Sequence, residues 1–130
     1  MKMLLTASLL TLVLFTACKK DPQPAAPSLK GKWTIENFMY KEYVGGALTD
    51  TYTEPGAGGT MDFQNNGNVV FTVPGDPIET HPYSIKPDSK VDIDGDIFEI
   101  RNLTASNVTL FIRQDYAPGE YDEAYINLKR

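Results

Sequence analysis

The sequence predicts an all-β fold, an up-and-down antiparallel β-barrel of about eight strands. Three observations lead to this fold class. Apolar and polar residues alternate through most of the chain after residue 28, which is the period of a half-buried strand. Clusters of Gly, Pro, Asn and Asp separate these runs and mark turns. No part of the same region has the spacing of an amphipathic helix. Tight sequential hairpins favour a closed barrel, which has no open strand edges, and a two-sheet β-sandwich is the alternative.

The expected strands follow from the turn residues between them. In the first and longest strand we expect Trp33, Ile35, Asn37 and Met39 to share one face. Asn66-Gly67 and Asp94-Gly95 predict tight hairpin turns, and Pro82 suggests that its strand lies at an edge or is irregular. Strands are expected at 33–44, 48–53, 60–64, 68–73 and 78–86, around Val91 and Ile93, around Phe98 and Ile100, from Val108 to Ile112 and from Ala124 to Leu128, with loops at 55–59 and 115–119.

The N-terminus has the pattern of a bacterial export signal. Lys2 supplies a positive charge, and a mostly apolar run extends from Met3 to Phe15. This run of about 13 residues is too short for the roughly 20 that a spanning helix needs. The segment 14–18, Leu-Phe-Thr-Ala-Cys, resembles the lipobox of bacterial lipoproteins, with Phe15 where Leu is usual. We therefore expect 1–17 to be a signal peptide and Cys18 to be the acylated first residue of the mature protein, rather than a small residue inside a membrane helix.

Residues 18–27 are expected to form a lipidated tether. The stretch 22–27, Pro-Gln-Pro-Ala-Ala-Pro, has no apolar periodicity and should be semi-extended. Several acyl chains, such as palmitate, make a stable anchor on Cys18, whereas one chain binds a membrane only marginally. Lys19 is not the Asp that retains many lipoproteins in the inner membrane. The expected location is therefore the outer membrane, with the domain facing either the periplasm or the cell surface.

Charge and cysteine content exclude several classes of partner and site. Without Lys2 the chain has 11 basic and 17 acidic residues, a net charge of about −6. Nucleic acid is not an expected partner, because a basic face is needed to displace counterions from phosphates. The only local basic cluster, Lys19-Lys20, lies beside the anchor, where it can meet anionic lipid head groups. With a single cysteine in the chain, no intramolecular disulfide can form.

Short motifs recur along the expected strands in a characteristic order. Residues 29–33 (Leu-Lys-Gly-Lys-Trp) open the first strand, and 61–63 (Met-Asp-Phe), 66–68 (Asn-Gly-Asn), 83–85 (Tyr-Ser-Ile), 91–100, 103–104 (Leu-Thr) and 108–110 (Val-Thr-Leu) follow. In this order and behind a lipoprotein signal, they resemble the lipocalin-like lipoproteins common in Bacteroidota, over about residues 28–114. The resemblance implies a lipocalin-like β domain at 28–130.

The resemblance also implies one structural signature. In lipocalins a Gly-x-Trp strand, here Gly31 and Trp33, closes one end of the barrel, and a late basic side chain packs over the indole. Arg113 is the candidate for that side chain, with Lys129 or Arg130 as alternatives. This pair has a structural role, and the resemblance alone assigns no ligand.

The residue inventory predicts no catalytic residues, no metal site and no cofactor. His81 is the only histidine, no nucleophile-elbow pattern surrounds any serine, and zinc has neither a second His nor a free Cys. We expect His81 to be exposed and inert. The run Asp92-Ile93-Asp94-Gly95-Asp96 could offer oxygen ligands to Ca²⁺, but Leu103 stands where an EF-hand needs Glu, and a solvated Asp-Gly hairpin explains the same residues.

The expected function is therefore that of a membrane-anchored, non-enzymatic protein, with a barrel that binds a small apolar or amphipathic ligand. The alternative is a protein-interaction module, such as a hydrolase inhibitor or an accessory subunit of a cell-envelope complex, which would use the loops at 55–59 and 115–121. Aromatic residues could line a binding groove, although tyrosines in β domains more often cover half-buried sheet faces. The tyrosines concerned are Tyr40, Tyr43, Tyr52, Tyr83, Tyr116, Tyr121 and Tyr125.

Overall fold

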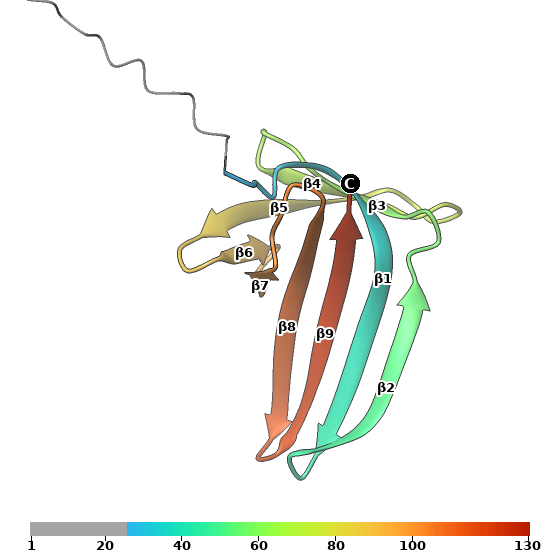
Figure 1. Cartoon of the computed structure of the whole chain (residues 1–130), viewed down its shortest axis with the longest axis vertical. Helices are drawn as coiled ribbons and strands as arrows, with labels where there is room; N and C mark the ends of the chain where they lie inside the picture. The colour runs from blue at the N-terminus through green and yellow to red at the C-terminus, as the bar shows by residue number, and fades with distance from the viewer. Residues whose placement is uncertain (1–25) are drawn as a thin grey trace, which may run out of the picture.

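The computed structural model describes residues 26–130, and this part of the chain is all-β (Figure 1). The expected signal peptide, Cys18 and most of the tether lie outside the described residues. No helix in the described part is long and apolar enough to cross a membrane. The strands are β1 (Gly31–Val44), β2 (Ala47–Pro55), β3 (Thr60–Phe63), β4 (Asn68–Thr72), β5 (Glu79–Lys86), β6 (Lys90–Ile93), β7 (Asp96–Arg101), β8 (Asn107–Ala117) and β9 (Glu120–Lys129).

The strands close into a lipocalin-like antiparallel barrel, as the sequence predicts. Each strand from β3 to β9 pairs with its neighbours in chain order, and β1 completes the ring by pairing with β3 on one edge and β9 on the other. Eight strands therefore form the barrel, and β2 is an additional strand outside the ring. The β-sandwich alternative does not apply, because a single continuous sheet closes on itself.

β2 and β3 act as two halves of one interrupted strand beside β1. β2 pairs with residues 37–44 of β1 and β3 with residues 31–34, both on the edge opposite β9. Between them, residues 56–59 loop over the middle of β1, where Gly56 N–H donates to Glu36 O at 3.1 Å and Ile35 N–H donates to Gly59 O at 2.8 Å. A Cβ at Gly56 would lie 1.9 Å from Ile35 O, so only glycine fits there. The expected loop at 55–59 is thus tightly packed on β1.

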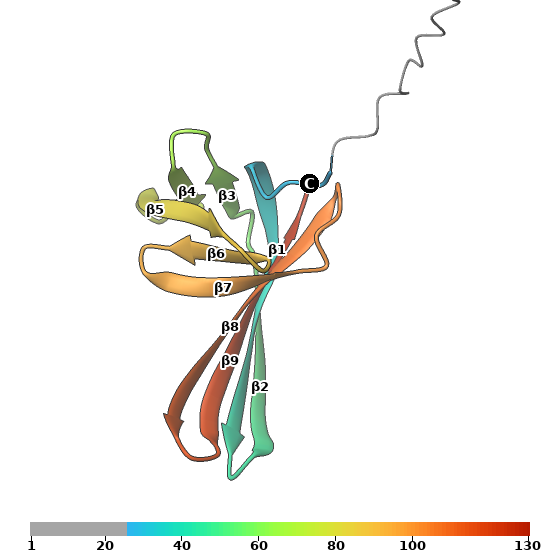
Figure 2. The same ribbon diagram turned by 90° about the vertical axis from the view of Figure 1, so that its left-hand side faces the viewer.

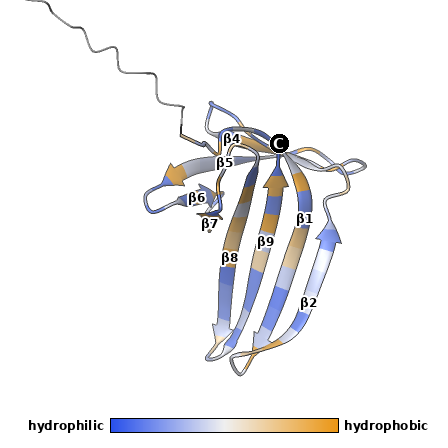
Figure 3. Cartoon of the chain, in the orientation of Figure 1, coloured by the Kyte–Doolittle hydropathy of each residue, from blue (hydrophilic) through white to orange (hydrophobic). Residues whose placement is uncertain are grey.

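Beyond this loop the sheet leaves the barrel. Figures 1 and 2 show β8, β9, β1 and β2 continuing together past the shorter barrel strands. We call this part the sheet extension and define it as residues 39–44, 47–55, 112–117 and 120–125. Figure 3 shows that these distal halves are mostly hydrophilic, whereas the halves of β1, β8 and β9 within the barrel carry the apolar residues. The barrel alone therefore contains the hydrophobic core.

A β-bulge in β1 decides which residues face that core. The register between β1 and β9 shifts between Ile35 and Asn37, so Phe38, and not Asn37, follows Ile35 inward and packs on the core. The expectation that Asn37 and Met39 share the face of Trp33 is therefore wrong. The core residues are Leu29, Trp33, Ile35, Met61, Phe63, Val69, Val91, Val108, Leu110 and Leu128.

Two other local expectations also need correction. Pro82 is not in an edge strand, since β5 pairs with both β4 and β6. The ladder with β6 ends at Tyr83, one residue before Pro82, and the Pro82 carbonyl accepts the N–H of Asp94 at 2.9 Å, so the missing N–H of proline interrupts no ladder. The expected loop at 115–119 is shorter than predicted, because β8 continues to Ala117.

The closed end of the barrel is held by Arg130. Its guanidinium carbon lies 3.9 Å from the ring centroid of Trp33, which is completely buried and donates its own indole N–H to a backbone carbonyl. Arg130 also donates to three carbonyls, those of Lys30 at 2.8 Å, Ser28 at 3.0 Å and Ala105 at 3.0 Å. One side chain thus ties the first strand, the segment before it and the loop between β7 and β8 to the last residue.

The basic partner of Trp33 is therefore Arg130 and not Arg113, the first candidate from the sequence. Arg113 lies in the sheet extension, 3.6 Å from the ring of Tyr121, and donates to Asp115. Gly31 fits the Arg130 arrangement in two ways: its φ is +104°, and a Cβ there would lie 3.2 Å from Arg130 Nη1.

Arg130→Ala should destabilise the domain by about 2 kcal/mol, because a cation–π contact is worth roughly 0.5–2 kcal/mol and charge-assisted hydrogen bonds add to it. Urea unfolding followed by the fluorescence of Trp33 would measure the change. Arg113→Ala, which removes an exposed arginine from another aromatic ring, is the matched control and should shift the midpoint much less. Equal shifts for the two variants would contradict the structural role of Arg130.

Candidate functional site

An apolar pocket opens at the end of the barrel opposite Arg130. Its volume is about 270 Å³, and its lining comes from seven of the eight barrel strands. We call it the mouth pocket. Phe38 of β1 and Ile126 of β9 form the wall that continues into the sheet extension. The other lining residues are Met61, Val69, Phe71, His81, Ile93, Asp94, Asp96 and Phe98.

The barrel is filled by its own side chains below the pocket and open only at its mouth. Trp33, Leu110 and Leu128 are buried and occupy the interior towards the closed end. Nearer the opening, Phe38 and Phe71 meet edge to face with ring centroids 6.4 Å apart. Both rings are only partly buried, so they present apolar surface to whatever enters. This geometry suits the apolar part of a small molecule.

One side of the mouth carries an ionisable cluster around His81. Its Nε2 lies 3.1 Å from Glu79 Oε2, and its Nδ1 lies 3.2 Å from Asp94 Oδ2. The hydrogen bond to Glu79, followed by that to Asp94, raises the pKa of His81 above its ordinary value of 6.5. The imidazole is 36 % exposed, at the rim of the mouth pocket in a strand paired on both sides. Its hydrogen-bond partners are carboxylates, which do not make the nucleophile and base pair of a hydrolase.

The acidic run at 92–96 forms the tight hairpin that the sequence predicts. Asp94 and Gly95 both have positive φ, +52° and +96°, between β6 and β7. The three carboxylates serve different contacts: Asp92 accepts the N–H of Gly95 at 2.8 Å, Asp94 meets His81, and Asp96 lines the mouth pocket. Within residues 26–130, no group of three or more His, Cys, Asp or Glu side chains is arranged to hold a metal ion.

The outer face of the sheet extension is covered by aromatic rings and cations. Tyr43 and Tyr121 stack with centroids 4.5 Å apart, and Phe111 meets Tyr125 at 5.0 Å. Lys41 lies 5.3 Å from the ring of Tyr125. Burial, followed by a hydrogen bond to Glu123, raises the pKa of Tyr125 to about 12. Here the tyrosines have the expected role of covering a sheet face.

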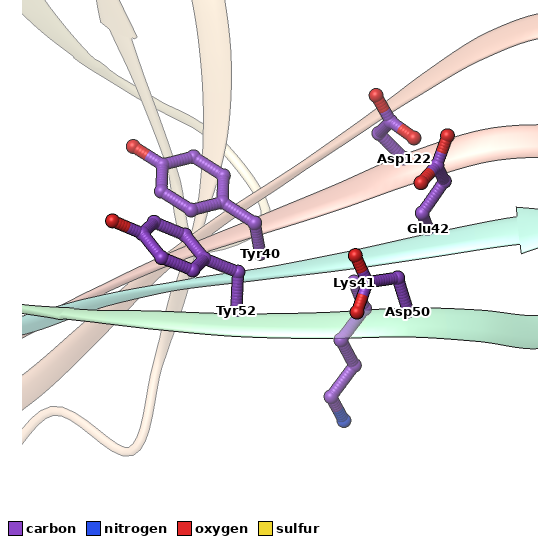
Figure 4. A pocket seen from close by; sticks show the side chains of 6 residues that line it. All are labelled: Tyr40, Lys41, Glu42, Asp50, Tyr52 and Asp122. Atoms are coloured by element: carbon purple, nitrogen blue, oxygen red, sulfur yellow. The ribbon is translucent and has the colours of Figure 1, made fainter.

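The inner face of the sheet extension has a different composition. Tyr40, Glu42, Asp50, Tyr52 and Asp122 surround a shallow hollow of about 320 Å³, shown in Figure 4. This face continues from the wall of the mouth pocket, because Tyr40 and Glu42 follow Phe38 at alternate positions of β1. Sequence analysis missed the carboxylates of this group. The alternation of Tyr and Glu in one strand and of Asp and Tyr in the next is the signal that could have revealed them.

Comparison with known proteins gives no guide to this site, since no family model and no curated protein matches the chain. Inference about function therefore depends on the geometry of the chain itself.

The raised pKa of His81 predicts a pH-dependent contribution to stability. The contribution is fully present below pH 6.5, the value in the unfolded chain, and is lost as the pH rises through the higher pKa of the folded state. Because His81 is the only histidine, an NMR titration of its ring protons gives the pKa without overlap. Glu79→Gln should lower that pKa. Asp92→Asn, whose carboxylate contacts Gly95 instead, should leave it unchanged, and a drop in both variants would refute the pairing.

Proposed function

We propose that this protein is a membrane-anchored, non-enzymatic lipoprotein whose lipocalin-like barrel binds a small apolar or amphipathic ligand in the mouth pocket. The observation that carries the proposal is the pocket itself, which is apolar in its walls and ionisable on one side of its rim. An amphipathic molecule has the same division, with a hydrocarbon part to bury and a polar part to keep in water.

The size of the pocket limits the ligand. Ligand sites usually have volumes of about 300–1,000 Å³, and the mouth pocket, at about 270 Å³, is slightly below that range. Each buried methylene contributes about 0.8 kcal/mol, so a short hydrocarbon part is enough for measurable binding. A long acyl chain would not fit, because Trp33, Leu110 and Leu128 fill the rest of the barrel.

The chain enters the domain at the end away from the pocket. Ser28 and Lys30 are held at the closed end by Arg130, which places the start of the described chain opposite the mouth (Figure 1). A lipid on Cys18 would therefore anchor the protein through the closed end and leave the mouth accessible. This arrangement supports attachment to the outer membrane, and it is the same whether the domain faces the periplasm or the cell surface.

A second candidate function is a protein-interaction module, such as a hydrolase inhibitor or an accessory subunit of an envelope complex. The loops at 55–59 and 115–119 do not support it, since the first packs on β1 and the second is mostly strand. The sheet extension favours it instead, because its inner face exposes Tyr40 and Tyr52 next to unpaired carboxylates.

The anchor proposal predicts that Cys18→Ala abolishes acylation. Cells expressing the chain in radiolabelled palmitate should incorporate label into the wild-type protein and none into the variant, because only the Cys18 thiol can accept the diacylglycerol. Ser28→Ala, next to the tether, is the control and should still be labelled. Label in the Cys18→Ala protein would rule out this anchor.

The ligand proposal predicts that filling the mouth pocket prevents binding. For the domain of residues 26–130, Ile93→Trp should weaken binding of the apolar fluorescent probe N-phenyl-1-naphthylamine by about tenfold or more. Ile97→Trp is the matched control, because Ile97 lies in the same hairpin, is 52 % exposed and does not line the pocket. Absence of probe binding to the wild-type domain, or equal binding by both variants, would show that the pocket takes no such ligand.

A further inference from the structure

The inner face of the sheet extension places three carboxylates in one row. Glu42 of β1 lies directly opposite Asp50 of β2 on one side and Asp122 of β9 on the other. Directly paired residues of antiparallel strands point to the same face, so all three carboxylates project together. Like charges in directly opposite positions destabilise a sheet. We call these residues, with Tyr40 and Tyr52, the acidic–tyrosine face.

No cation on the same face compensates this row. Lys41 follows Tyr40 in β1 but points to the opposite side of the sheet, as Figure 4 shows, and lies over Tyr125. Arg113 is likewise held on the outer face, against Tyr121 and Asp115. The sheet extension is therefore electrically two-sided, with cations and aromatic rings on its outer face and carboxylates on its inner face.

The hydrogen bonds of the carboxylates are local and come from neutral groups. Asp122 accepts from the Tyr116 hydroxyl at 2.9 Å, and Asp50 accepts from the N–H of Thr51 at 2.8 Å. Each of these bonds leaves other lone pairs of the carboxylate free. In the described part of the chain, the row of Glu42, Asp50 and Asp122 makes no salt bridge.

Two stacked tyrosines lie beside the row. Tyr40 and Tyr52 are directly paired across β1 and β2, with ring centroids 6.2 Å apart and an interplanar angle of 23°. They remain 42 % and 56 % exposed, whereas Tyr121 and Tyr125 of the outer face are covered by neighbouring side chains. Exposed tyrosines are the residue type that protein interfaces prefer, and their faces attract cations.

We propose that the acidic–tyrosine face docks a lysine- or arginine-bearing segment of another protein. A cationic head group placed above Glu42 would meet Asp50 and Asp122 as well, and its hydrocarbon stem would lie along Tyr40 and Tyr52. Charge complementarity identifies this occupant: nucleic acid and anionic membranes carry the wrong sign, and a neutral sugar does not require three aligned carboxylates. The surface is distinct from the mouth pocket, so the proposal does not depend on ligand binding.

The open edge of β2 gives such a segment room to approach. In the described chain β2 pairs only with β1, and all nine of its residues are exposed. Asp50 and Tyr52, the outermost members of the acidic–tyrosine face, project from this edge strand.

The test compares two triple variants of equal charge. The full chain, purified in non-ionic detergent, is titrated into a short fluorescein-labelled peptide of alternating arginine and serine, and binding is followed by fluorescence anisotropy. Glu42→Gln, Asp50→Asn and Asp122→Asn together should weaken binding by about tenfold or more, because they remove the aligned row. The control triple, Glu36→Gln, Asp76→Asn and Asp88→Asn, removes three exposed carboxylates outside the sheet extension and should change affinity by less than about twofold. Equal losses would show attraction to net charge alone and overturn the proposal.

Two further measurements exclude trivial outcomes. Removal of like-charge repulsion should raise the thermal midpoint of the first triple variant, which also proves that it folds; a lowered midpoint would mean that the row is structural and overturn the proposal. Tyr52→Thr should weaken peptide binding about threefold with the carboxylates intact, and Tyr43→Thr, on the outer face, should not. Binding of a neutral oligosaccharide in place of the peptide, lost in the same first triple variant, would replace the protein partner with a carbohydrate.

Discussion

The close approach of Gly56 to the Ile35 carbonyl determines much of the geometry of this protein. The contact lies where the partner strand of β1 is interrupted, and β1 shifts its register with β9 at the same level, between Ile35 and Asn37. A one-residue shift reverses the faces of every later residue in a strand. Without it, Phe38, Tyr40 and Glu42 would project outward. The wall of the mouth pocket and the acidic–tyrosine face therefore share one structural cause.

The two ends of the barrel differ because different residues close them. At one end Arg130 spans three backbone carbonyls and covers Trp33, so the interior is sealed and the chain entering there is fixed. At the other end the bulge and the loop at 56–59 carry four strands past the rim, and no side chain of comparable size fills the mouth. An anchor at the sealed end and an opening at the other are consistent with a protein that presents its binding surfaces away from the membrane.

The sequence predicted what local rules control and missed what depends on contacts between distant residues. Alternation identified the inward residues of the later strands, and Asp94-Gly95 predicted its turn, because the positive φ values are a property of those residues. The bulge in β1 left no such signal: Asn37 and Phe38 are both compatible with a regular strand, and only the packing of Gly56 decides between the faces. The choice between Arg113 and Arg130 likewise depended on which end of β8 or β9 meets Trp33, which alternation does not specify.

The same limit explains why the carboxylate row was missed. Glu42, Asp50 and Asp122 are unremarkable in the sequence, and they form one row only because the register of β1 with β2 and with β9 aligns them. The sheet extension adds little to the hydrophobic core and leaves strand edges open, both of which cost stability. A row of like charges adds to that cost, although exchange of any one of the three for a neutral residue would relieve it. Local destabilisation that the core does not require is typical of surfaces that have a partner, because function and not folding then determines their composition.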